Sequence, residues 1–531
     1  MSLVRSIDKW STHLHPRLNS PKSPGRPRDQ EIQKGPLMVS ATDLPSSALR
    51  GSGAGFIERH GLWSEAQQSA AEEIGAKVQE GDIRQVRIGW GDQHGIMRGK
   101  TLTVPEFVRS LRDGKDFQLV TTVFDTTNHP IVAPFDAGNF PGVPELNGLP
   151  DGLLVPDPAT FRLLPWADGT ASILSDAYFQ NGKPVPFSTR EVLRTQLGQL
   201  SDLGLQYVAG LEIELYIMRL LDPMLSPEHC GWPPEPPRVE GLSHGFQYLT
   251  ESRNDEIHEL LDHLQNELVA LGLPLATIED EWGPGQIEVT FEPQVGLECA
   301  DSALLLRTAI KQICRRLGYH ATFMARPAFP EFFPSGWHLH QSLRSVDGGN
   351  NAFADASGHE RLSPEGLHWI GGLLAHAAAS SVFTTPTITG YKRYRPDSFA
   401  PDRVTWAYEN RGAMLRVIGE PGSPAAHVEN RIGDSAANPY LYLASQVAAG
   451  IDGLRQGLDP GEPSLEPYKA SARLLPKSLM EALAVLREDT FFRSAFGDVF
   501  VDYILRIKDF EVGRFLSHVT DWEHQEYFEM Y

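Results

Sequence analysis

Glutamate and histidine residues alternate with apolar residues in four short segments of the chain. In residues 208–218, Glu212 and Glu214 alternate with leucine and isoleucine. Because successive side chains of a β-strand point to opposite faces, this spacing predicts a strand with one acidic and one apolar face. The same alternation recurs in three further segments. On one face it places Glu288 in residues 286–291, His338, His340 and Ser342 in residues 337–343, and His427, Glu429 and Arg431 in residues 427–431.

Taken singly, a Glu-x-Glu or His-x-His pair is more often part of a solvated strand face than of a site. If the four strands pair in one sheet, however, they gather their acids in a concave surface, and Glu281 joins them from the end of a neighbouring segment. Carboxylates packed together repel one another and raise each other's pKa, and divalent cations remove that repulsion. A carboxylate-rich site with a single imidazole suits Mg²⁺ or Mn²⁺.

Arginine residues supply positive charge beside these acids. Arg393, Arg411, Arg416 and Arg431 all lie in the last third of the chain. Planar guanidinium groups bind carboxylates and phosphates through two hydrogen bonds at once. Metal-binding acids beside arginines, without a Ser-His-Asp arrangement or a cysteine nucleophile, favour phosphoryl transfer. The sequence has no Gly-x-x-x-x-Gly-Lys-Ser/Thr motif, which excludes nucleotide binding of the P-loop type.

A small β-rich domain is predicted before the acidic segments. Residues 86–90 and 100–104 alternate like two strands around a turn at residues 91–95. An Ala- and Glu-rich segment at residues 62–80 precedes them and is typical of a helix. These elements indicate a domain at residues 62–165, so the acidic strands and the arginines belong to a second, larger domain.

Two helices are predicted among the strands of that larger domain. The first begins at Ser188, with Glu191 three residues later as the second half of a capping box. The second covers residues 255–271, where leucine and isoleucine recur at helical spacing.

Composition limits the class of protein. The chain has 531 residues, 41% of them hydrophobic, and a net charge of −21, which excludes a largely disordered chain and disfavours nucleic-acid binding. No apolar run is long enough for a membrane helix, and three sparse cysteines favour neither a disulfide framework nor a zinc site. We therefore expect a cytoplasmic protein. Residues 1–61, with a proline-rich basic start, are predicted to be a flexible extension.

The longer motifs resemble the glutamine synthetase superfamily in sequence and order. They are Gly210-Leu-Glu-Ile-Glu214, Gly283-Pro-Gly-Gln-Ile-Glu288, Ser335-Gly-Trp-His-Leu-His-Gln-Ser342, Tyr391-Lys-Arg393, Asn410-Arg411, Val428-Glu-Asn-Arg431 and Ala436-Ala-Asn-Pro-Tyr440. In addition, residues 92–100 resemble that family's small N-terminal domain. The resemblance covers residues 62–531.

The resemblance implies an α+β fold with a β-grasp N-terminal domain at residues 62–165. The catalytic domain, residues 166–531, would hold an open antiparallel β-sheet flanked by helices. Subunits of this family self-associate into stacked rings, a dodecamer or decamer, with active sites between neighbouring subunits. The implied reaction uses ATP and roughly two or three Mg²⁺ or Mn²⁺ ions per site to phosphorylate a side-chain carboxylate, which an amine then attacks.

Roles for individual residues follow from the same resemblance. The metal ligands would be Glu214, Glu281 and Glu288 for one ion, and Glu212, His338 and Glu429 for another. The catalytic residues would be Arg411 and Arg431, which stabilise the transferring phosphoryl group, and Asp125, which enters from the neighbouring subunit and helps to deprotonate the amine. The substrate-binding residues would be Arg393, Gly336, Phe399 and Tyr248. The nucleotide-binding residues would be His340, Ser342 and Arg416.

Three departures from the family pattern concern the substrate. Glutamine-forming members carry a glutamate before Ala-Pro in the loop after Tyr-Lys-Arg, where this chain has Phe399. The turn that holds the glutamate amino group is replaced by Phe333-Pro-Ser-Gly336, and the basic residues before the last metal glutamate are replaced by Pro424 and His427. The acids and arginines for acyl-phosphate chemistry remain, whereas those for ammonia capture do not all remain.

This combination resembles the γ-glutamyl-amide ligases of the superfamily, which join glutamate to an organic amine. Trp282, Trp337, Phe333 and Phe399 would form an aromatic entrance that favours an apolar or aromatic amine, although a core position is the alternative for Trp337. Two other functions stay open, a glutamine synthetase that uses ammonia and a catalytically inactive structural or regulatory relative. The presence of every expected metal ligand argues against the inactive relative.

Overall fold

The computed structural model describes residues 53–133, 135–136, 138–330, 332–395 and 398–531. Of the predicted extension, residues 1–61, the first 52 residues lie outside the described residues. Its last residues are part of the fold, because helix α1 (Phe56–Arg59) buries Phe56 and Ile57 against Val155.

The N-terminal sheet has the strand order β2-β1-β6-β4-β3, with β5 beside β6. The predicted hairpin is confirmed, since β1 (Gln85–Gly91) pairs antiparallel with β2 (Met97–Thr103). β1 also pairs in parallel with β6 (Thr170–Tyr178), so this sheet extends beyond the predicted domain boundary at residue 165. The other strands are β3 (Lys115–Gln118), β4 (Asp151–Pro156) and β5 (Arg162–Leu163).

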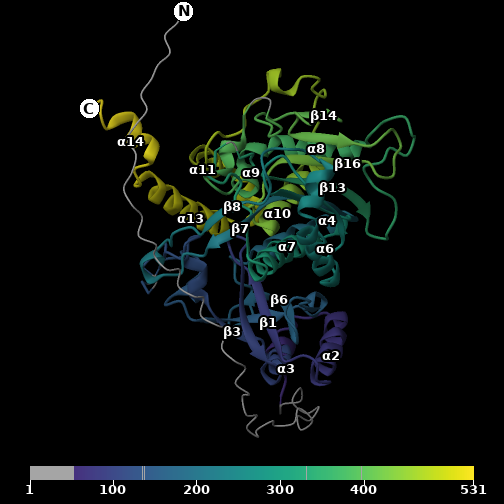
Figure 1. Ribbon diagram of the computed structural model, residues 1–531. Helices are drawn as coiled ribbons and strands as arrows, with labels where there is room; N and C mark the ends of the chain where they lie inside the picture. Colours follow the sequence, from purple (N-terminus) through teal and green to yellow (C-terminus); the bar gives the residue numbers. More distant parts are fainter. Residues whose placement is uncertain (1–52, 134, 137, 331, 396–397) are drawn as a thin grey trace, which may run out of the picture. The chain divides into compact units, whose positions relative to one another are not determined.

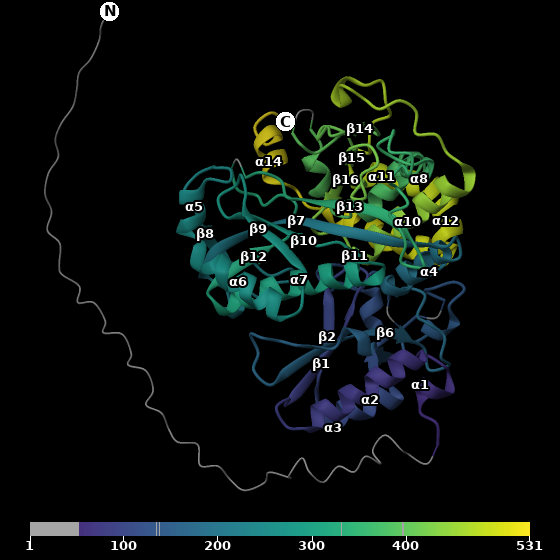
Figure 2. The same cartoon turned by 90° about the vertical axis from the view of Figure 1, so that its right-hand side faces the viewer.

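Two helices of this domain pack against its sheet, as Figure 2 shows. Helix α2 (Glu65–Gln79) begins with a capping box in which Ser64 and Gln67 bond to each other's backbone. Helix α3 (Val104–Asp113) follows β2 directly and buries Phe107, Val108 and Leu111.

The larger sheet has ten strands in the order β14-β15-β16-β13-β7-β10-β9, with β8, β11 and β12 also paired to β7 (Figure 1). All its pairs are antiparallel except β14 with β15. The strands are β7 (Leu205–Asp222), β8 (Arg238–Gly241), β9 (Leu275–Asp280), β10 (Gln286–Phe291), β11 (Gln294–Val295), β12 (Tyr319–Thr322), β13 (Gly336–Ser345), β14 (Trp406–Tyr408), β15 (Leu415–Ile418) and β16 (His427–Asp434). The four predicted acidic strands correspond to β7, β10, β13 and β16 and lie next to one another.

The apolar face of this sheet packs on helices. Leu211, Ile213 and Leu215 of β7 are buried there, together with apolar side chains of α4 (Thr189–Ser201), α7 (Leu297–Arg316) and α10 (Pro439–Gln456). Because this packing fixes one face of each strand, the alternating acids are held on the other face.

Both helices predicted in the larger domain are present, with local differences. α4 begins after Ser188, but the Ser188 side chain makes no capping hydrogen bond, and Glu191 instead contacts Arg194. The predicted capping box is therefore wrong. The segment predicted at residues 255–271 is divided at Ile257 into α5 (Glu251–Glu256) and α6 (His258–Ala270).

The C-terminal part is largely helical, with α8 (Pro364–Ala375), α9 (Ala377–Thr384), α11 (Leu479–Glu488), α12 (Thr490–Phe496), α13 (Asp498–Leu516) and α14 (Asp521–Tyr527). Short 3-10 helices lie at Leu119–Val123, Pro144–Leu146, Pro158–Thr160, Pro227–His229, Gly390–Arg393 and Pro467–Lys469. No helix in the described ranges is long and apolar enough to cross a membrane. Cys230, Cys299 and Cys314 are free thiols.

A buried arginine ties the N-terminal sheet to the larger domain. Arg190 of α4 donates to Asp157 at 2.7 Å, to Asp176 at 2.9 Å and to Asp301 at 2.8 Å. Asp157 and Asp176 belong to the N-terminal sheet region, whereas Asp301 lies on α7. Tyr440 of α10 also donates to Asp301, so one network joins elements from both domains.

Candidate active site

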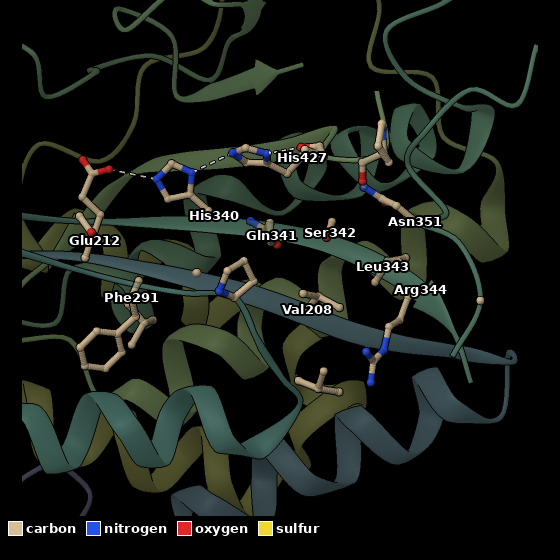
Figure 3. A pocket seen from close by; sticks show the side chains of 18 residues that line it. Val208, Glu212, Phe291, His340, Gln341, Ser342, Leu343, Arg344, Asn351 and His427 are labelled. Carbon is tan, nitrogen blue, oxygen red and sulfur yellow. Dashed lines mark hydrogen bonds and ion pairs between the residues drawn. The ribbon is translucent and has the colours of Figure 1, made fainter. Parts of the chain in front are cut away.

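Two adjoining cavities lie on the acidic face of the ten-stranded sheet. The acidic pocket has a volume of about 600 Å³ and is lined by Glu212, Glu214, Glu281, Glu288, His338, Arg393, Arg411, Arg431, Gly336, Tyr248 and Phe399, all of them predicted site residues. The β13 pocket has a volume of about 610 Å³ and is lined by Glu212, His340, Ser342, Pro424 and His427, among others (Figure 3). Glu212 and Thr290 line both cavities, so the two adjoin.

Three glutamates stand close together on the β7–β10–β9 side. Glu288 lies directly opposite Glu214 in the strand register, and Glu281 follows the end of β9. Burial, with a contribution from neighbouring carboxylates, raises the pKa of Glu214 to about 8, that of Glu281 to about 7 and that of Glu288 to about 10. These carboxylates therefore repel one another when all are ionised.

Partners for the three glutamates are few. Glu214 accepts hydrogen bonds from Gln286 Nε2 at 2.8 Å and from the Gly336 backbone at 3.1 Å. The nine-tenths buried carboxyl group of Glu288 has no hydrogen-bond or ion-pair partner among the described residues. Oxygens of Glu279, Glu281 and Glu288 lie within 4.8 Å of one another. Glu279 accepts a hydrogen bond from the Thr277 hydroxyl at 3.0 Å, whereas Glu288 is unpaired, and an oxygen-only donor set of this kind fits a hard divalent cation.

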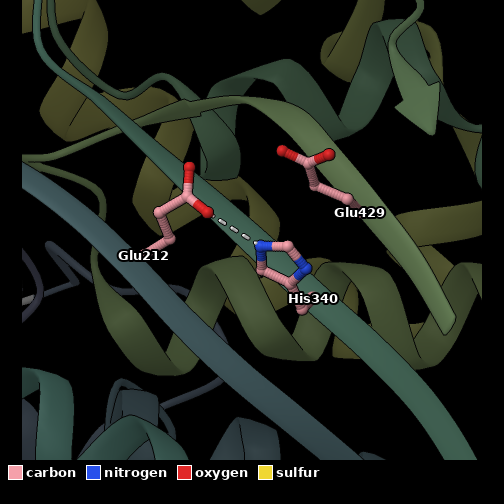
Figure 4. Close-up of side chains that lie close together, drawn as sticks. All are labelled: Glu212, His340 and Glu429. Carbon is pink, nitrogen blue, oxygen red and sulfur yellow. Dashed lines mark hydrogen bonds and ion pairs between the residues drawn. The ribbon is translucent and has the colours of Figure 1, made fainter. Parts of the chain in front are cut away.

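The second group of donors surrounds His338. Its Nδ1 contacts Glu212 and lies 3.7 Å from Glu429 Oε1, and His340 Nε2 lies 3.0 Å from Glu212 Oε2. Figure 4 shows Glu212, His340 and Glu429 side by side. One possible ligand atom of each lies within 4.8 Å of those of the other two. Burial alone would raise the pKa of Glu212, but His338 and His340 hold it well below its usual range. Its carboxylate is therefore ionised and able to bind a cation.

Arginines surround the carboxylate of Glu429. Arg431 contacts it from the same strand, and Arg416 donates to it at 3.2 Å. Arg416 also donates to Glu409 Oε2 at 2.7 Å, and it lines neither of the two cavities. Arg431 Nε donates to the backbone carbonyl of Arg411 at 3.1 Å, which ties the two arginines predicted to act on a phosphoryl group to each other.

Gly336 lies close to the guanidinium group of Arg393. A Cβ at this position would stand 2.7 Å from an Arg393 guanidinium nitrogen and 3.4 Å from His338 Nε2. Arg393 is itself buried and donates to the Ile432 carbonyl at 3.1 Å. Only glycine leaves this guanidinium free to face the pocket.

Aromatic side chains form one side of the acidic pocket. Tyr248 stacks on Trp282 with ring centroids 4.9 Å apart, Trp282 lies 5.7 Å from Phe333, and Phe333 lies 5.6 Å from Phe246. We call these four residues the aromatic rim. All four are partly exposed, as is Phe399. Trp337 is completely buried and packs edge-on against Tyr442, so the core position is the correct alternative for this residue.

Asp125 lies apart from both cavities within its own chain. Its side chain is 1% exposed, and it accepts hydrogen bonds from Thr127 N at 2.9 Å and His129 N at 2.8 Å. Arg514 of α13 contacts its other oxygen. Trp232 steadies the same loop, because its indole nitrogen donates to the Thr127 carbonyl at 2.6 Å. The loop around Asp125 is thus held from several sides.

Some residues of the site were not predicted. Glu279 of β9 lines the acidic pocket and lies two residues before Glu281, so period-two alternation could have identified it. Phe246 and Glu409 have no comparable signal, because loops bring them to the rim and to Arg416.

Comparison with known proteins places this site in a family. The family model described as glutamine synthetase, catalytic domain, matches residues 186–527. The γ-glutamylanilide synthase of Acinetobacter sp is 42% identical over 494 residues, which cover 90% of this chain and 99% of that protein. The glutamate–isopropylamine ligase of Pseudomonas sp is 32% identical over 85% of this chain and 96% of its own length.

A solved structure shows the same fold. The structure titled apo GmaS without ligand superposes with a TM-score of 0.71 at 25% sequence identity, and covers 87% of this chain and 99% of its own. The α+β architecture expected from the resemblance is therefore confirmed at the level of a glutamine synthetase-type fold. Together with the converged acids and arginines, these matches show that the chain belongs to the glutamine synthetase family and is a ligase of that family.

Proposed function

We propose that this protein uses ATP to activate the γ-carboxylate of glutamate and joins it to an organic amine, forming a γ-glutamyl amide. The observation that carries the proposal is the composition of one pocket. Five of the six residues predicted to bind metal line it, as do the two arginines predicted to act on a phosphoryl group, and the sixth, Glu429, lies 3.7 Å from His338. Phe399, which by the family resemblance replaces the acid of ammonia-using members, lines the same pocket. The names of the two sequence relatives, an anilide synthase and an isopropylamine ligase, support the same reaction class.

The proposed reaction has two steps. A γ-carboxylate oxygen of glutamate forms a bond to the terminal phosphorus of ATP, and ADP leaves. The amine nitrogen then forms a bond to the acyl carbon, inorganic phosphate leaves, and the nitrogen gives up a proton. A carboxylate is a poor electrophile because it lacks a good leaving group, and phosphorylation supplies one. Arg411 and Arg431 stabilise charge on the phosphoryl oxygens during transfer, and Arg393 holds the glutamate.

The carboxylate donor set would hold Mg²⁺ or Mn²⁺. Glu214, Glu281 and Glu288 would bind one ion, and Glu212, His338 and Glu429 another. When bound, such ions offset the charge repulsion between ATP and the carboxylate. Phosphates of the nucleotide would extend into the β13 pocket beside His340 and Ser342. Arg416 is paired with Glu429 and Glu409 and lines neither cavity, so its contact with the nucleotide stays a prediction.

The amine would enter along the aromatic rim. Trp282 and Phe333 line the acidic pocket on the side of Glu281, and Phe399 lies on its border. Rings at this position pack on an apolar or aromatic substituent and exclude water from the acyl phosphate. The alternative function, a glutamine synthetase, would require an acid to bind ammonium where Phe399 stands.

Asp125 would act in a neighbouring subunit. Its distance from the cavities of its own chain agrees with a site shared between subunits, and we propose the stacked-ring assembly of the family for this chain. We also propose that the N-terminal sheet is a β-grasp domain. Its boundary with the catalytic domain would follow β6, because that strand is paired with β1.

The experiment is a product assay. The purified protein is incubated with glutamate, ATP and Mg²⁺, and with one member of a panel that contains aniline, isopropylamine, ethanolamine or ammonia. Released phosphate and the γ-glutamyl product are both measured. We expect phosphate and amide in equal amounts for at least one organic amine. Phosphate release without any amide would overturn the proposal.

A further inference from the structure

A third cavity lies between the N-terminal hairpin and the helices of the larger domain. It has a volume of about 300 Å³, at the lower end of the range for small-molecule sites. The turn between β1 and β2 contributes His94 and Ile96, α7 contributes Arg307 and Lys311, and α13 contributes Lys508. Figure 2 shows β2 below α7 at this junction. We call it the junction cavity; none of its residues takes part in the reaction described above.

The inner wall of the junction cavity is apolar. Phe383 of α9, Leu441 of α10 and Ile504 of α13 line it and are almost completely buried. Side chains that are packed in the core in this way keep the wall rigid, and they offer a surface for a hydrocarbon group rather than for a solvated ion.

The charged residues of this cavity all have one sign. Arg307, Lys311 and Lys508 line it, and none of its described lining residues is acidic, although the chain as a whole carries a net charge of −21. A cleft lined by charges of one sign concentrates its field and attracts the opposite ion. The junction cavity is therefore an unusual cationic site in an acidic protein.

Two of these cations lack an acidic partner. Arg307 donates to the carbonyl oxygens of Gly95 at 2.7 Å and Ala437 at 2.8 Å, and Lys311 donates to that of Ala321 at 3.2 Å. Neither forms an ion pair within the described residues. Lys508, in contrast, is paired with Glu511 at 2.9 Å.

Asp434 and Asp92 lie near enough to raise the pKa of Arg307 and partly offset its burial, but neither forms an ion pair with it. Asp92 is bound to Arg98 at 2.7 Å, and Asp434 accepts from the Thr387 hydroxyl at 2.7 Å. Arg307 and Lys311 are also four residues apart on one helix, a spacing at which like charges repel. Burial lowers the pKa of Arg307 to about 10, and burial and Arg307 lower that of Lys311. An anion between the two side chains would offset both the burial and the repulsion.

We propose that the junction cavity binds a small organic acid, with its carboxylate at Lys311 and Arg307 and its apolar body against Phe383, Leu441 and Ile504. The site is distinct from the acidic pocket and needs neither ATP nor glutamate. Thr126 lines the same cavity, so the ligand also touches the loop that carries Asp125.

Calorimetric titration of the full-length protein with benzoate tests this inference. We expect saturable binding that saturating glutamate and ATP leave unchanged. Benzamide, which has the same shape without the charge, should bind at least about tenfold more weakly, as expected for the loss of one charge-assisted hydrogen bond.

Two cavity variants and one control variant test whether benzoate binds in the junction cavity. Lys311→Met should weaken benzoate binding about tenfold. Ile96→Asp, at an exposed position of the mouth, should weaken it at least as much by adding a negative charge. Lys477→Met removes an exposed lysine that does not line the cavity and should have no effect. Absence of saturable binding, displacement by glutamate, equal binding of benzamide, or unchanged binding in both cavity variants would each overturn the proposal.

Discussion

Glu288 is a single residue whose carboxyl group is repelled by the neighbouring acids of the acidic pocket. Its carboxyl group is buried among other glutamates, and its pKa is raised to about 10. Such a group contributes little to the packing of the core, but it offers oxygen atoms to a cation. Replacing Glu288 should therefore affect cation binding without weakening the fold.

The first prediction concerns the metal ligands Glu288 and Glu281, whose loss should affect activity but not stability. Glu288→Ala and Glu281→Ala should each lower turnover at saturating Mg²⁺ by roughly a hundredfold or more, because one ligand is lost. The free energy of unfolding without metal should stay equal or rise, since a repelling carboxylate is removed. Steady-state kinetics and urea unfolding measure the two effects, with Glu292→Ala, an exposed glutamate, as the control. Full turnover in either pocket variant would contradict the metal assignment.

The second prediction concerns Phe399. Phe399→Glu should move the preference toward ammonia by roughly ten- to a hundredfold, because a carboxylate there can bind ammonium through charged hydrogen bonds. It should also weaken the use of a bulky apolar amine, since that group would desolvate the new charge. The ratio of kcat/KM for ammonia to that for the best organic amine measures both. An unchanged ratio would show that Phe399 does not set amine choice.

Single residues were predictable where period-two spacing applied. Glu212, Glu214, Glu288, His338 and Glu429 stand on the face that alternation assigned to them. Alternation also places Trp337 on the apolar face, where the structure buries it against Tyr442, so its place in the predicted aromatic entrance is wrong. Arg514 contacts Asp125 across a sequence distance that no local pattern spans.

At the scale of elements, burial of one sheet face positions the acids. β7 is paired on both sides and its apolar residues are covered by helices, so it cannot slip by one residue without exposing them. Strand existence was therefore predictable. The extent of the N-terminal sheet was not, because the pairing of β6 with β1 is long-range. The failed capping box reflects a competing local contact of Glu191 with Arg194.

The third prediction tests the tie between the two sheets. Arg190→Met leaves three buried aspartates around an uncharged side chain and should cost about 3–5 kcal/mol of unfolding free energy. Arg84→Met breaks an exposed pair with Asp168 and should cost no more than about 1 kcal/mol. Chemical unfolding of both variants gives the comparison. Equal, small losses would show that the Arg190 network does not hold the domains together.

At the scale of the whole molecule, the unit of function is proposed to be larger than one chain. Asp125 is buried away from both cavities of its own chain, and its loop is fixed by Arg514 and Trp232. In the single chain its carboxylate is occupied by Arg514, Thr127 and His129, so action in a neighbouring subunit would require Asp125 to exchange these contacts on assembly. The sequence could indicate this only through the family resemblance, since assembly depends on surfaces rather than on local patterns.

The fourth prediction tests shared sites. Asp125→Ala and Glu214→Ala proteins should each be inactive. When the two are mixed under conditions that allow reassembly, some sites would receive an intact Asp125 from one subunit and an intact Glu214 from the other. We expect partial recovery of amide synthesis. No recovery in assemblies shown to contain both variants would count against a shared site.

A choice between an organic amine and ammonia as the acceptor is decided by comparing kcat/KM for ammonia with kcat/KM for each amine of the panel, in the unmodified protein with saturating glutamate, ATP and Mg²⁺. We expect an apolar or aromatic amine to be preferred over ammonia by roughly tenfold or more, because Phe399 supplies no charge to bind ammonium. Preference for ammonia over every amine tested would contradict this expectation and identify a glutamine synthetase.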